Sequence, residues 1–307
     1  MIKLALLETK SSKPALLLLL GLLVPGAASS QDLAPRPLSE ASPASDAAPI
    51  YSPAFSKTQE LFLTGGSVGL LLTGALYPID MQSVPAEGFD PAEIAWSVDR
   101  DIVGNRDVAR SNTSDWTRDA ALLLPFVMGL AMSPSNDRWE HFGRRSAVYG
   151  EAFLLNLGTT VLLKTTVGRA RPFAYLTEGL RPDDPVYDAS KDRTFRSMPS
   201  GHTSTAWTGA TLAMTEHLLS RPQASAFERI GVGFAAGTLA SVTAALRTSA
   251  GQHFPSDVIA GTGIGVASGL VVPLLHRSET PMPTTEAWLQ MIGGAVGGVV
   301  FGFVLGR

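Results

Sequence analysis

After Lys57 the chain consists mainly of long apolar segments separated by polar stretches. None of these segments alternates between apolar and polar residues with the period of two that marks a half-buried strand, and all exceed the roughly 4–8 residues of a buried strand. We therefore expect helices at residues 60–77, 118–133, 146–165, 203–220, 228–246, 257–275 and 287–305. No tandem repeat divides them, which predicts an all-α helical bundle of about six core helices plus a C-terminal glycine-rich helix.

Glycine recurs at every fourth position in the last two segments, in the rows Gly261, Gly265, Gly269 and Gly294, Gly298, Gly302, Gly306. On a helix such a row forms a groove in which another backbone can approach closely. The pattern is typical of membrane helices, since glycine lowers the stability of a water-exposed helix by about 1 kcal/mol relative to alanine. A tightly packed soluble bundle is the alternative.

Composition excludes several classes of protein. The 307 residues include no cysteine, and 45% are hydrophobic and 17% charged. This excludes a disulfide scaffold, a thiolate metal site and a cysteine nucleophile, and it argues against intrinsic disorder. The formal net charge of −3 offers no surplus of cations for a nucleic-acid backbone, so we expect no nucleic-acid partner.

The N-terminal segment has the pattern of a secretory signal peptide. Lysines precede an apolar run over residues 15–24, and small residues follow it. The run is short for a membrane span, which takes about 20 residues. We therefore expect residues 1–30 to be a signal peptide, with an uncleaved anchor as the alternative. Residues 31–57 are rich in Pro, Ala, Ser and Asp and are expected to form a disordered tether.

Polar residues gather at the ends of apolar segments in three clusters, Lys164-x6-Arg171-Pro172, Pro199-Ser200-Gly201-His202 and Arg247-x5-His253-x3-Asp257. Each cluster alone reads as an ordinary basic helix end, helix start or capping pair. All three in one chain, each at the end of an apolar helix, point to a single site.

The cationic members of these clusters favour an anion between them. Lys164, Arg171 and Arg247 stand beside apolar helix ends, where an unpaired charge is unfavourable. Arginine's planar fork matches phosphate oxygens, and lysine supplies a point charge. Ser200 and Gly201 stand at the start of a helix, and the backbone N–H groups there also attract an anion. These residues predict a site for one tetrahedral oxyanion.

The histidines add reactive groups to this site. His253 and Asp257 are about one helical turn apart, so the carboxylate can fix the tautomer of the imidazole and leave its other nitrogen free to attack. His202 lies on another helix and can protonate a departing alkoxide.

Other polar residues are assigned no chemistry. His141, His217 and His276 lack partners nearby in sequence and are expected to be surface or packing residues. The acidic stretch 181–193 lacks the spacing and central glycine of a calcium loop, so we expect a solvated lid there. Trp207 and Phe195 flank the site in sequence, and we expect them to pack in the core.

The three clusters together resemble the signature of the type-2 phosphatidic-acid phosphatase and vanadium-haloperoxidase superfamily, which is Lys-x6-Arg-Pro, Pro-Ser-Gly-His and Ser-Arg-x5-His-x3-Asp. The resemblance spans residues 118–275. In this chain Leu246 replaces the serine of the third motif. We therefore expect an N-terminal helix and polar insertion at 58–117, a catalytic bundle at 118–275 and the glycine-rich helix at 276–307.

The resemblance implies a role for each residue of the site. His253 would attack phosphorus and become phosphohistidine, Asp257 would orient it, and His202 would be the general acid. The phosphate oxygens would be held by a cradle of the remaining signature residues, Lys164, Arg171, Ser200, Gly201 and Arg247. Phosphatases of this family need no metal and no other cofactor, whereas its haloperoxidases hold vanadate in the same pocket.

These residues leave several hypotheses open. The first is a metal-independent phosphatase acting on a phosphate ester, which the apolar helices suggest is lipid-linked. A vanadate-dependent haloperoxidase and a lipid phosphotransferase are alternatives on the same site, and a non-catalytic envelope bundle is a third class. Phosphatidate, undecaprenyl pyrophosphate, a lipid A phosphate and a small soluble ester would all present the same group.

The positions of the arginines and the number of membrane-crossing segments predict opposite orientations in a membrane. Arginines lie in the loops opposite the clusters, at 138–145 and 221–229, which favours a cytoplasmic location for those loops and a periplasmic site. A cleaved signal followed by two spans before residue 146 would instead place the site in the cytoplasm. Either segment 60–77 does not cross, or the bundle is soluble or peripheral, or the signal assignment is wrong. We expect a bacterial envelope protein, membrane-embedded or membrane-associated, whose site faces the periplasm.

Overall fold

The computed structural model describes residues 50–52, 56–78, 84–85, 87–175, 186–187 and 192–306. The expected signal peptide lies outside the described residues, as do most of the expected tether and most of the lid at 181–193.

The described chain is built from helices, which confirms the all-α class. The long helices are α5 (Val108–Ala131), α6 (Arg138–Val167), α7 (Gly201–Ser220), α8 (Ala226–Ser249), α9 (Pro255–His276) and α10 (Thr285–Leu305). An N-terminal rod joins α2 (Lys57–Glu60), η1 (Leu61–Gly65) and α3 (Gly66–Leu76), and the short helices are η2 (Pro91–Glu93), α4 (Ser97–Arg100), η3 (Pro172–Tyr175) and η5 (Asp192–Phe195). Among the described residues, extended chain pairs at a bridge between Tyr51 and Arg277.

Helix α5 begins earlier than its apolar run suggests. It starts at Val108 rather than at residue 118, and its N-cap is Asp107, whose side chain accepts a hydrogen bond from the backbone N–H of Arg110 at 2.9 Å. The first turns are polar because they face the site described below. Hydropathy therefore does not reveal them, and the polar insertion before the bundle is shorter than expected.

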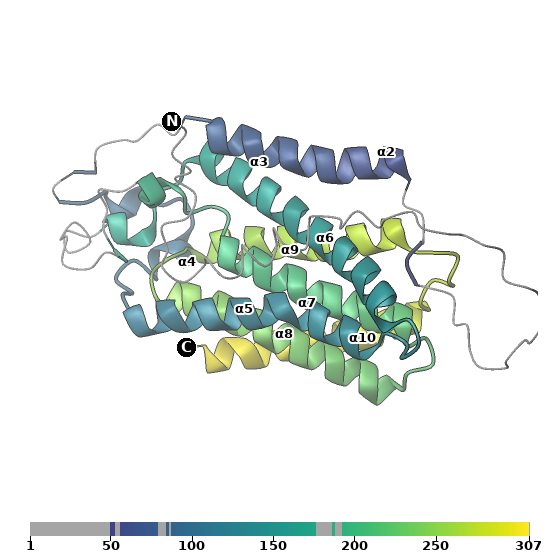
Figure 1. Ribbon diagram of the computed structural model, residues 1–307. Helices are drawn as coiled ribbons and strands as arrows, with labels where there is room; N and C mark the ends of the chain where they lie inside the picture. The colour runs from purple at the N-terminus through teal and green to yellow at the C-terminus, as the bar shows by residue number, and fades with distance from the viewer. Residues whose placement is uncertain are drawn as a thin grey trace, which may run out of the picture.

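The long helices lie lengthwise beside one another (Figure 1). The end of α6, the start of α7 and the turn between α8 and α9 lie at one end of the bundle, which we call the site end. The turns that join α5 to α6, α7 to α8 and α9 to α10 lie at the opposite end, the far end. The three clusters therefore share one end, because successive helices from α6 to α9 run in opposite directions.

The N-terminal rod runs along α6 in the same direction. A Cβ placed on Gly158 of α6 would lie 2.5 Å from the carbonyl O of Ser67, and one placed on Gly74 of α3 would lie 2.6 Å from the Cα of Leu162. Ser67 thus contacts Gly158, and Gly74 contacts Leu162 further along α6. Because α6 runs from the far end to the site end, the start of the rod lies toward the far end and its last residue, Leu76, toward the site end. Segment 60–77 therefore runs from the far end toward the site end.

The two glycine rows are helix seams, as the spacing predicts. A Cβ on Gly261 would lie 2.6 Å from the carbonyl O of Ser200, so α9 packs directly on the backbone of α7. In the same way a Cβ on Gly302 would lie 2.7 Å from the carbonyl O of Thr238, where α10 packs on α8. Any side chain at these positions would push the helices apart. The first seam fixes α9 against α7, the two helices that begin at the site end.

The end of the expected tether belongs to the fold. The Tyr51 side chain is buried and its hydroxyl donates a hydrogen bond to Oε2 of Glu216 at 2.9 Å. The backbone N–H of Ser52 donates to the carbonyl O of His276, also at 2.9 Å. The packed chain therefore begins before residue 57, where the tether was expected to end.

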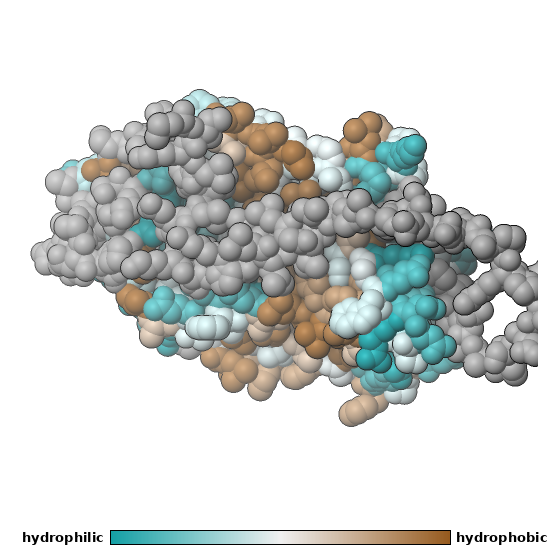
Figure 2. Space-filling model, viewed as in Figure 1, coloured by the Kyte–Doolittle hydropathy of each residue, from teal (hydrophilic) through white to brown (hydrophobic). Residues whose placement is uncertain are grey.

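Within the described part of the chain, four helices are long and apolar enough to cross a membrane, namely those within Arg138–Tyr175, Ala226–Ser249, Pro255–His276 and Thr285–Leu305. On α10, the face opposite the glycine seam exposes an apolar stripe of Leu289, Ile292, Val296, Val300 and Val304. Figure 2 shows hydrophobic residues along the middle of the helices and hydrophilic residues at the far end. This distribution suits a bundle in contact with lipid.

Candidate active site

The three clusters meet at the site end. The backbone N–H of Ser200 donates to the carbonyl O of Asp257 at 2.9 Å, which ties the second cluster to the third. The first cluster reaches the second through Lys164, whose Cε lies 3.5 Å from the position that a Cβ on Gly201 would take. Arg171 joins the first cluster to the third, since its Nη1 donates to the carbonyl O of Gln252 at 2.8 Å.

His253 stands between a carboxylate and a guanidinium. Its Nδ1 lies 3.6 Å from Oδ2 of Asp257, and its Nε2 lies 3.2 Å from Nη1 of Arg171. The side chain is buried, and its Nδ1 has no hydrogen-bond partner among the described residues. Burial and, next to it, the charge of Arg171 hold the pKa of His253 well below its usual range. The imidazole is therefore neutral at neutral pH, with a lone pair available on the nitrogen that faces Arg171.

Asp257 is fixed by several donors. Its Oδ2 accepts hydrogen bonds from the hydroxyl of Ser197 at 2.5 Å and from the backbone N–H of Phe254 at 2.9 Å. Its Oδ1 accepts one from Nη1 of Arg169 at 2.8 Å. These hydrogen bonds fix the position of the carboxylate, so it can hold the orientation of the neighbouring imidazole.

Arg169 extends this network to the insertion that precedes α5. Its Nη2 forms an ion pair with Oδ2 of Asp99 at 2.8 Å, and its guanidinium carbon lies 4.1 Å from the centre of the Phe254 ring. Asp99 is buried and also accepts hydrogen bonds from the backbone N–H and the hydroxyl of Ser256, at 3.0 and 2.6 Å. A residue far from the three clusters thus anchors the start of α9, and with it His253 and Asp257.

His202 faces α5. Its Nε2 lies 2.5 Å from Oδ1 of Asp115 and 2.9 Å from Nη1 of Arg118. One ring nitrogen cannot donate to the carboxylate and accept from the guanidinium at the same time, so the partner depends on the proton. The carboxylate favours a proton on Nε2, which leaves Nδ1 able to accept a proton.

Of the three cations of the site, Arg247 is buried, and Lys164 and Arg171 are half-buried. Arg247 donates from Nη1 to the hydroxyl of Ser114 at 3.1 Å, while its buried Nε has no hydrogen-bond partner within the described chain. Lys164 donates to the carbonyl O of Arg196 at 2.8 Å. A buried cation with an unsatisfied donor, close to two further cations, suits a site for a multiply charged anion.

Ser200 has a local role in this arrangement. Its side chain is the N-cap of α7 and accepts a hydrogen bond from the hydroxyl of Thr203 at 3.0 Å. Gly201 is the first residue of α7, where the backbone N–H groups at the helix start are available to an anion.

The residues that sequence reasoning missed lie mainly on α5. Ser111, Ser114, Asp115 and Arg118 follow one another at helical spacing and form a polar stripe that faces His202 and Arg247. This spacing of three and four residues just before an apolar segment is a signal that could have revealed them. Asp99 carries no comparable signal, because its partners are distant in the chain.

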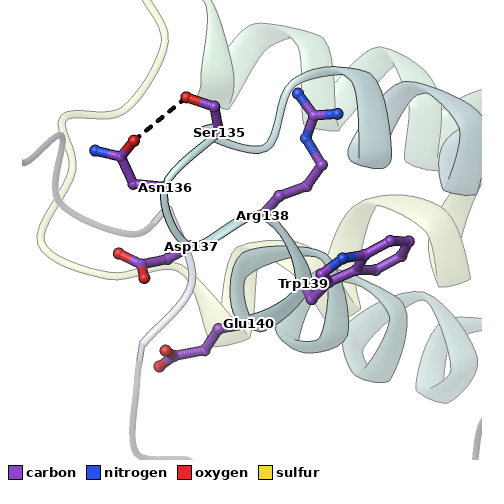
Figure 3. A pocket seen from close by; sticks show the side chains of 6 residues that line it. All are labelled: Ser135, Asn136, Asp137, Arg138, Trp139 and Glu140. Carbon is purple, nitrogen blue, oxygen red and sulfur yellow. Dashed lines mark hydrogen bonds between the residues drawn. The ribbon is translucent and has the colours of Figure 1, made fainter.

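The remaining expectations divide into two groups. Trp207 and Phe195 are buried, which agrees with packing roles. His276, expected to be a surface or packing residue, is buried, and its Nε2 lies 2.5 Å from Oε2 of Glu151 on a helix that is distant in sequence. A pocket lined by residues 135–140 lies at the α5–α6 turn (Figure 3), at the far end and away from the three clusters.

Comparison with known proteins agrees with this geometry. Residues 146–281 match the sequence profile described as the PAP2 superfamily. This stretch is a PAP2 superfamily domain. The lipid A 1-phosphatase of Rhizobium etli is 35% identical over 115 residues, which is 38% of this chain and 43% of that relative. The chain thus matches less than half the length of this curated relative. No solved structure matches the chain.

The PAP2 domain contains the three clusters from Lys164 to Asp257. The supporting residues Asp99, Asp115 and Arg118 lie before it in the chain. The helices that precede the PAP2 domain therefore complete its site.

Proposed function

We propose that the protein is a phosphatase, a phosphoric monoester hydrolase that acts through a phosphohistidine on His253 and needs no metal for the reaction. The observation that carries this proposal is the placement of His253 Nε2, 3.2 Å from an arginine of the phosphate cradle, with its Nδ1 turned to Asp257. Binding of phosphate oxygens by Arg171 would bring phosphorus in front of a neutral imidazole nitrogen.

In the first step the bond between His253 Nε2 and phosphorus forms while the ester P–O bond breaks. The departing alkoxide takes a proton from Nδ1 of His202. Burial and the neighbouring cations, Arg247 first, lower the pKa of this histidine, so its protonated form would depend on the negative charges of the bound phosphate and of Asp115. Lys164, Arg171 and Arg247 would hold the non-bridging oxygens, and their charge stabilises the negative charge of the transition state. Asp257 balances the charge that develops on His253.

In the second step water attacks the phosphohistidine. His202, now neutral, takes a proton from the water, the N–P bond breaks, and inorganic phosphate leaves with His253 restored. Apart from water and the substrate, every group in the two steps is a side chain of the protein. A short treatment with a chelator should therefore leave kcat unchanged.

A phosphorylated lipid is the substrate class that we propose. The name of the similar Rhizobium etli protein refers to the phosphate of a lipid, and the helices around the site expose apolar stripes toward the surroundings. A lipid anchored in the bilayer can then present its headgroup at the site end.

The activity test compares phosphate release from phosphatidate, a lipid A phosphate and p-nitrophenyl phosphate by the detergent-purified protein and by its His253→Ala variant. The proposal predicts release that the variant loses, inhibition by vanadate, and a preference for a lipid ester. Turnover by the folded His253→Ala variant would refute the mechanism. Equal turnover of a water-soluble ester would refute the lipid class alone.

We propose that the bundle spans a bacterial membrane with the site end facing the periplasm. The far end carries Arg144, Arg145 and Arg221, which favours the cytoplasm. Because the rod starts at the far end, this orientation requires residues 1–30 to act as something other than a cleaved signal. A bundle that is soluble or peripheral in the periplasm is the alternative that keeps the cleaved signal.

The chain has no cysteine, so its orientation can be read from single cysteines. Asp101→Cys lies at the site end and Ser135→Cys at the far end, and both positions are exposed. An impermeant maleimide added to intact cells should label the first variant and label the second only after the inner membrane is opened. Labelling of both variants would place the whole bundle in the periplasm, and labelling of Ser135→Cys alone would place the site in the cytoplasm.

A further inference from the structure

A second group of charged side chains lies between α2, α6 and α9, well away from the active site. Glu60, Glu151 and His276 each offer one ligand atom, and the three atoms lie within 4.8 Å of one another. His276 Nε2 is 2.5 Å from Oε2 of Glu151 and 3.9 Å from Oε1 of Glu60. We call these residues the Glu–Glu–His cluster. Along α9, His276 lies about 28 Å from Asp257, given a rise of about 1.5 Å per residue.

The cluster is set into the protein rather than onto its surface. The side chain of His276 is 1% exposed and that of Glu151 is 8% exposed, while Glu60 at 35% closes the outer side. The Oε1 atom of Glu60, which points to His276, is itself buried and has no hydrogen-bond partner among the described residues. A buried carboxylate oxygen without a donor is a strongly unfavourable arrangement that a cation would relieve.

The charges in the cluster do not balance. Within the described chain the ion pairs of Glu60 and Glu151 are both with His276. A protonated imidazole neutralises one carboxylate and leaves a net charge of −1 among apolar helices. Either a proton shared by the two carboxylates or a bound cation would neutralise this charge. Two carboxylates and one imidazole form a set of ligands that binds first-row divalent metals.

We propose that the Glu–Glu–His cluster binds one divalent transition-metal ion, for which zinc is the probe. Nε2 of His276 and one oxygen from each glutamate would be the ligands, with a fourth position open to water. Metal binding would displace the proton between His276 and Glu151. Thr64, whose hydroxyl donates to Oε1 of Glu151, would orient that ligand from outside.

Such an ion joins the N-terminal rod to the bundle. Glu60 lies at the start of the rod, and Glu151 and His276 lie on the two helices that flank it. Along the rest of its length the rod is held by contacts such as that of Ser67 with Gly158, and it exposes Leu61, Phe62 and Leu72 on its outer face. The metal therefore acts as a structural link at the far end and takes no part in the chemistry of His253.

The test uses the full-length protein in detergent, stripped with a chelator and dialysed, then titrated with zinc. We expect one equivalent to bind saturably and the Tm to rise by several degrees at about 100 times the Kd. Cobalt in the same site should give the visible absorption of a low-coordinate ion. Glu60→Gln and His276→Gln should each lose the equivalent and the rise in Tm, and Glu60→Gln keeps the test valid if the buried histidine variant fails to fold.

Matched controls are Glu286→Gln, at an exposed position on α10, and His141→Gln, on α6 outside the cluster. Both should bind zinc as the unaltered chain does. The proposal is overturned if zinc fails to bind, if Glu60→Gln binds it unchanged, or if the bound equivalent disappears in His253→Ala instead, which would place it at the active site.

Discussion

Replacement of Asp115 by Asn tests the role assigned to His202. The 2.5 Å contact between Asp115 Oδ1 and His202 Nε2 is a hydrogen bond to a charged group whenever the histidine is protonated, and such bonds contribute about 1.5–3 kcal/mol. Both side chains are partly exposed, at 24% and 21%, so the lower half of that range applies. Since about 1.36 kcal/mol corresponds to tenfold in rate, kcat/KM should fall about 10- to 40-fold.

The leaving group decides whether this loss reflects general acid catalysis. An alkyl phosphate needs a proton on its departing oxygen, whereas the p-nitrophenolate of p-nitrophenyl phosphate leaves without one. The Asp115→Asn variant should therefore lose the full factor with the alkyl ester and less than about threefold with the aryl ester. kcat/KM is the right quantity because it reports the steps up to P–O cleavage.

A neighbouring carboxylate gives the control. Asp119 pairs with Arg118 at 2.8 Å and, like Asp115, lies on α5, but the described contacts of His202 are with Asp115 and Arg118. Asp119→Asn should leave the ratio of the two substrates unchanged. An equal loss with both esters in Asp115→Asn, or the same loss in Asp119→Asn, would show that Asp115 acts through general electrostatics and that His202 is not the acid.

Two further predictions concern the supports of the site. Arg169→Met leaves Asp99 and Asp257 buried without their cation. The free energy of unfolding should fall by about 3–5 kcal/mol and turnover should be lost. A Tm within about a degree of that of the unaltered protein would contradict the ion-pair network. On α10, Gly298→Ala should lower the Tm because its Cβ would lie 2.7 Å from the backbone N of Thr238, whereas Gly293→Ala meets open space and should be neutral or stabilising. Equal effects at these two glycines would refute the seam.

The sequence predicted the parts of this protein that depend on local spacing. Apolar length marked the helices, the four-residue spacing of Gly261 and Gly302 marked their seams, and the motif positions of Lys164 and His253 marked the site. Each of these features depends on residues that are only a few positions apart in the chain.

The rest depends on contacts between distant parts of the chain. Asp115 and His202 are 87 positions apart in the chain, and Arg169 and Asp99 are 70 positions apart. No local pattern assigns a partner to a buried carboxylate, so Asp99 looked like part of a polar insertion. The pair of His276 and Glu151, 125 positions apart, was missed for the same reason. The polar stripe on α5 is the exception, because its helical spacing is visible once a helix is expected there.

The most direct test of the account is to trap the phosphorylated enzyme. The His202→Ala variant, given p-nitrophenyl phosphate, can complete the first step without an acid but lacks the base for the second, so it should accumulate the intermediate. After a rapid alkaline quench, peptide mass spectrometry should find up to one phosphoryl group per chain, labile to acid and located on His253. Phosphate on any other residue, or no phosphoenzyme while turnover continues, would contradict the mechanism.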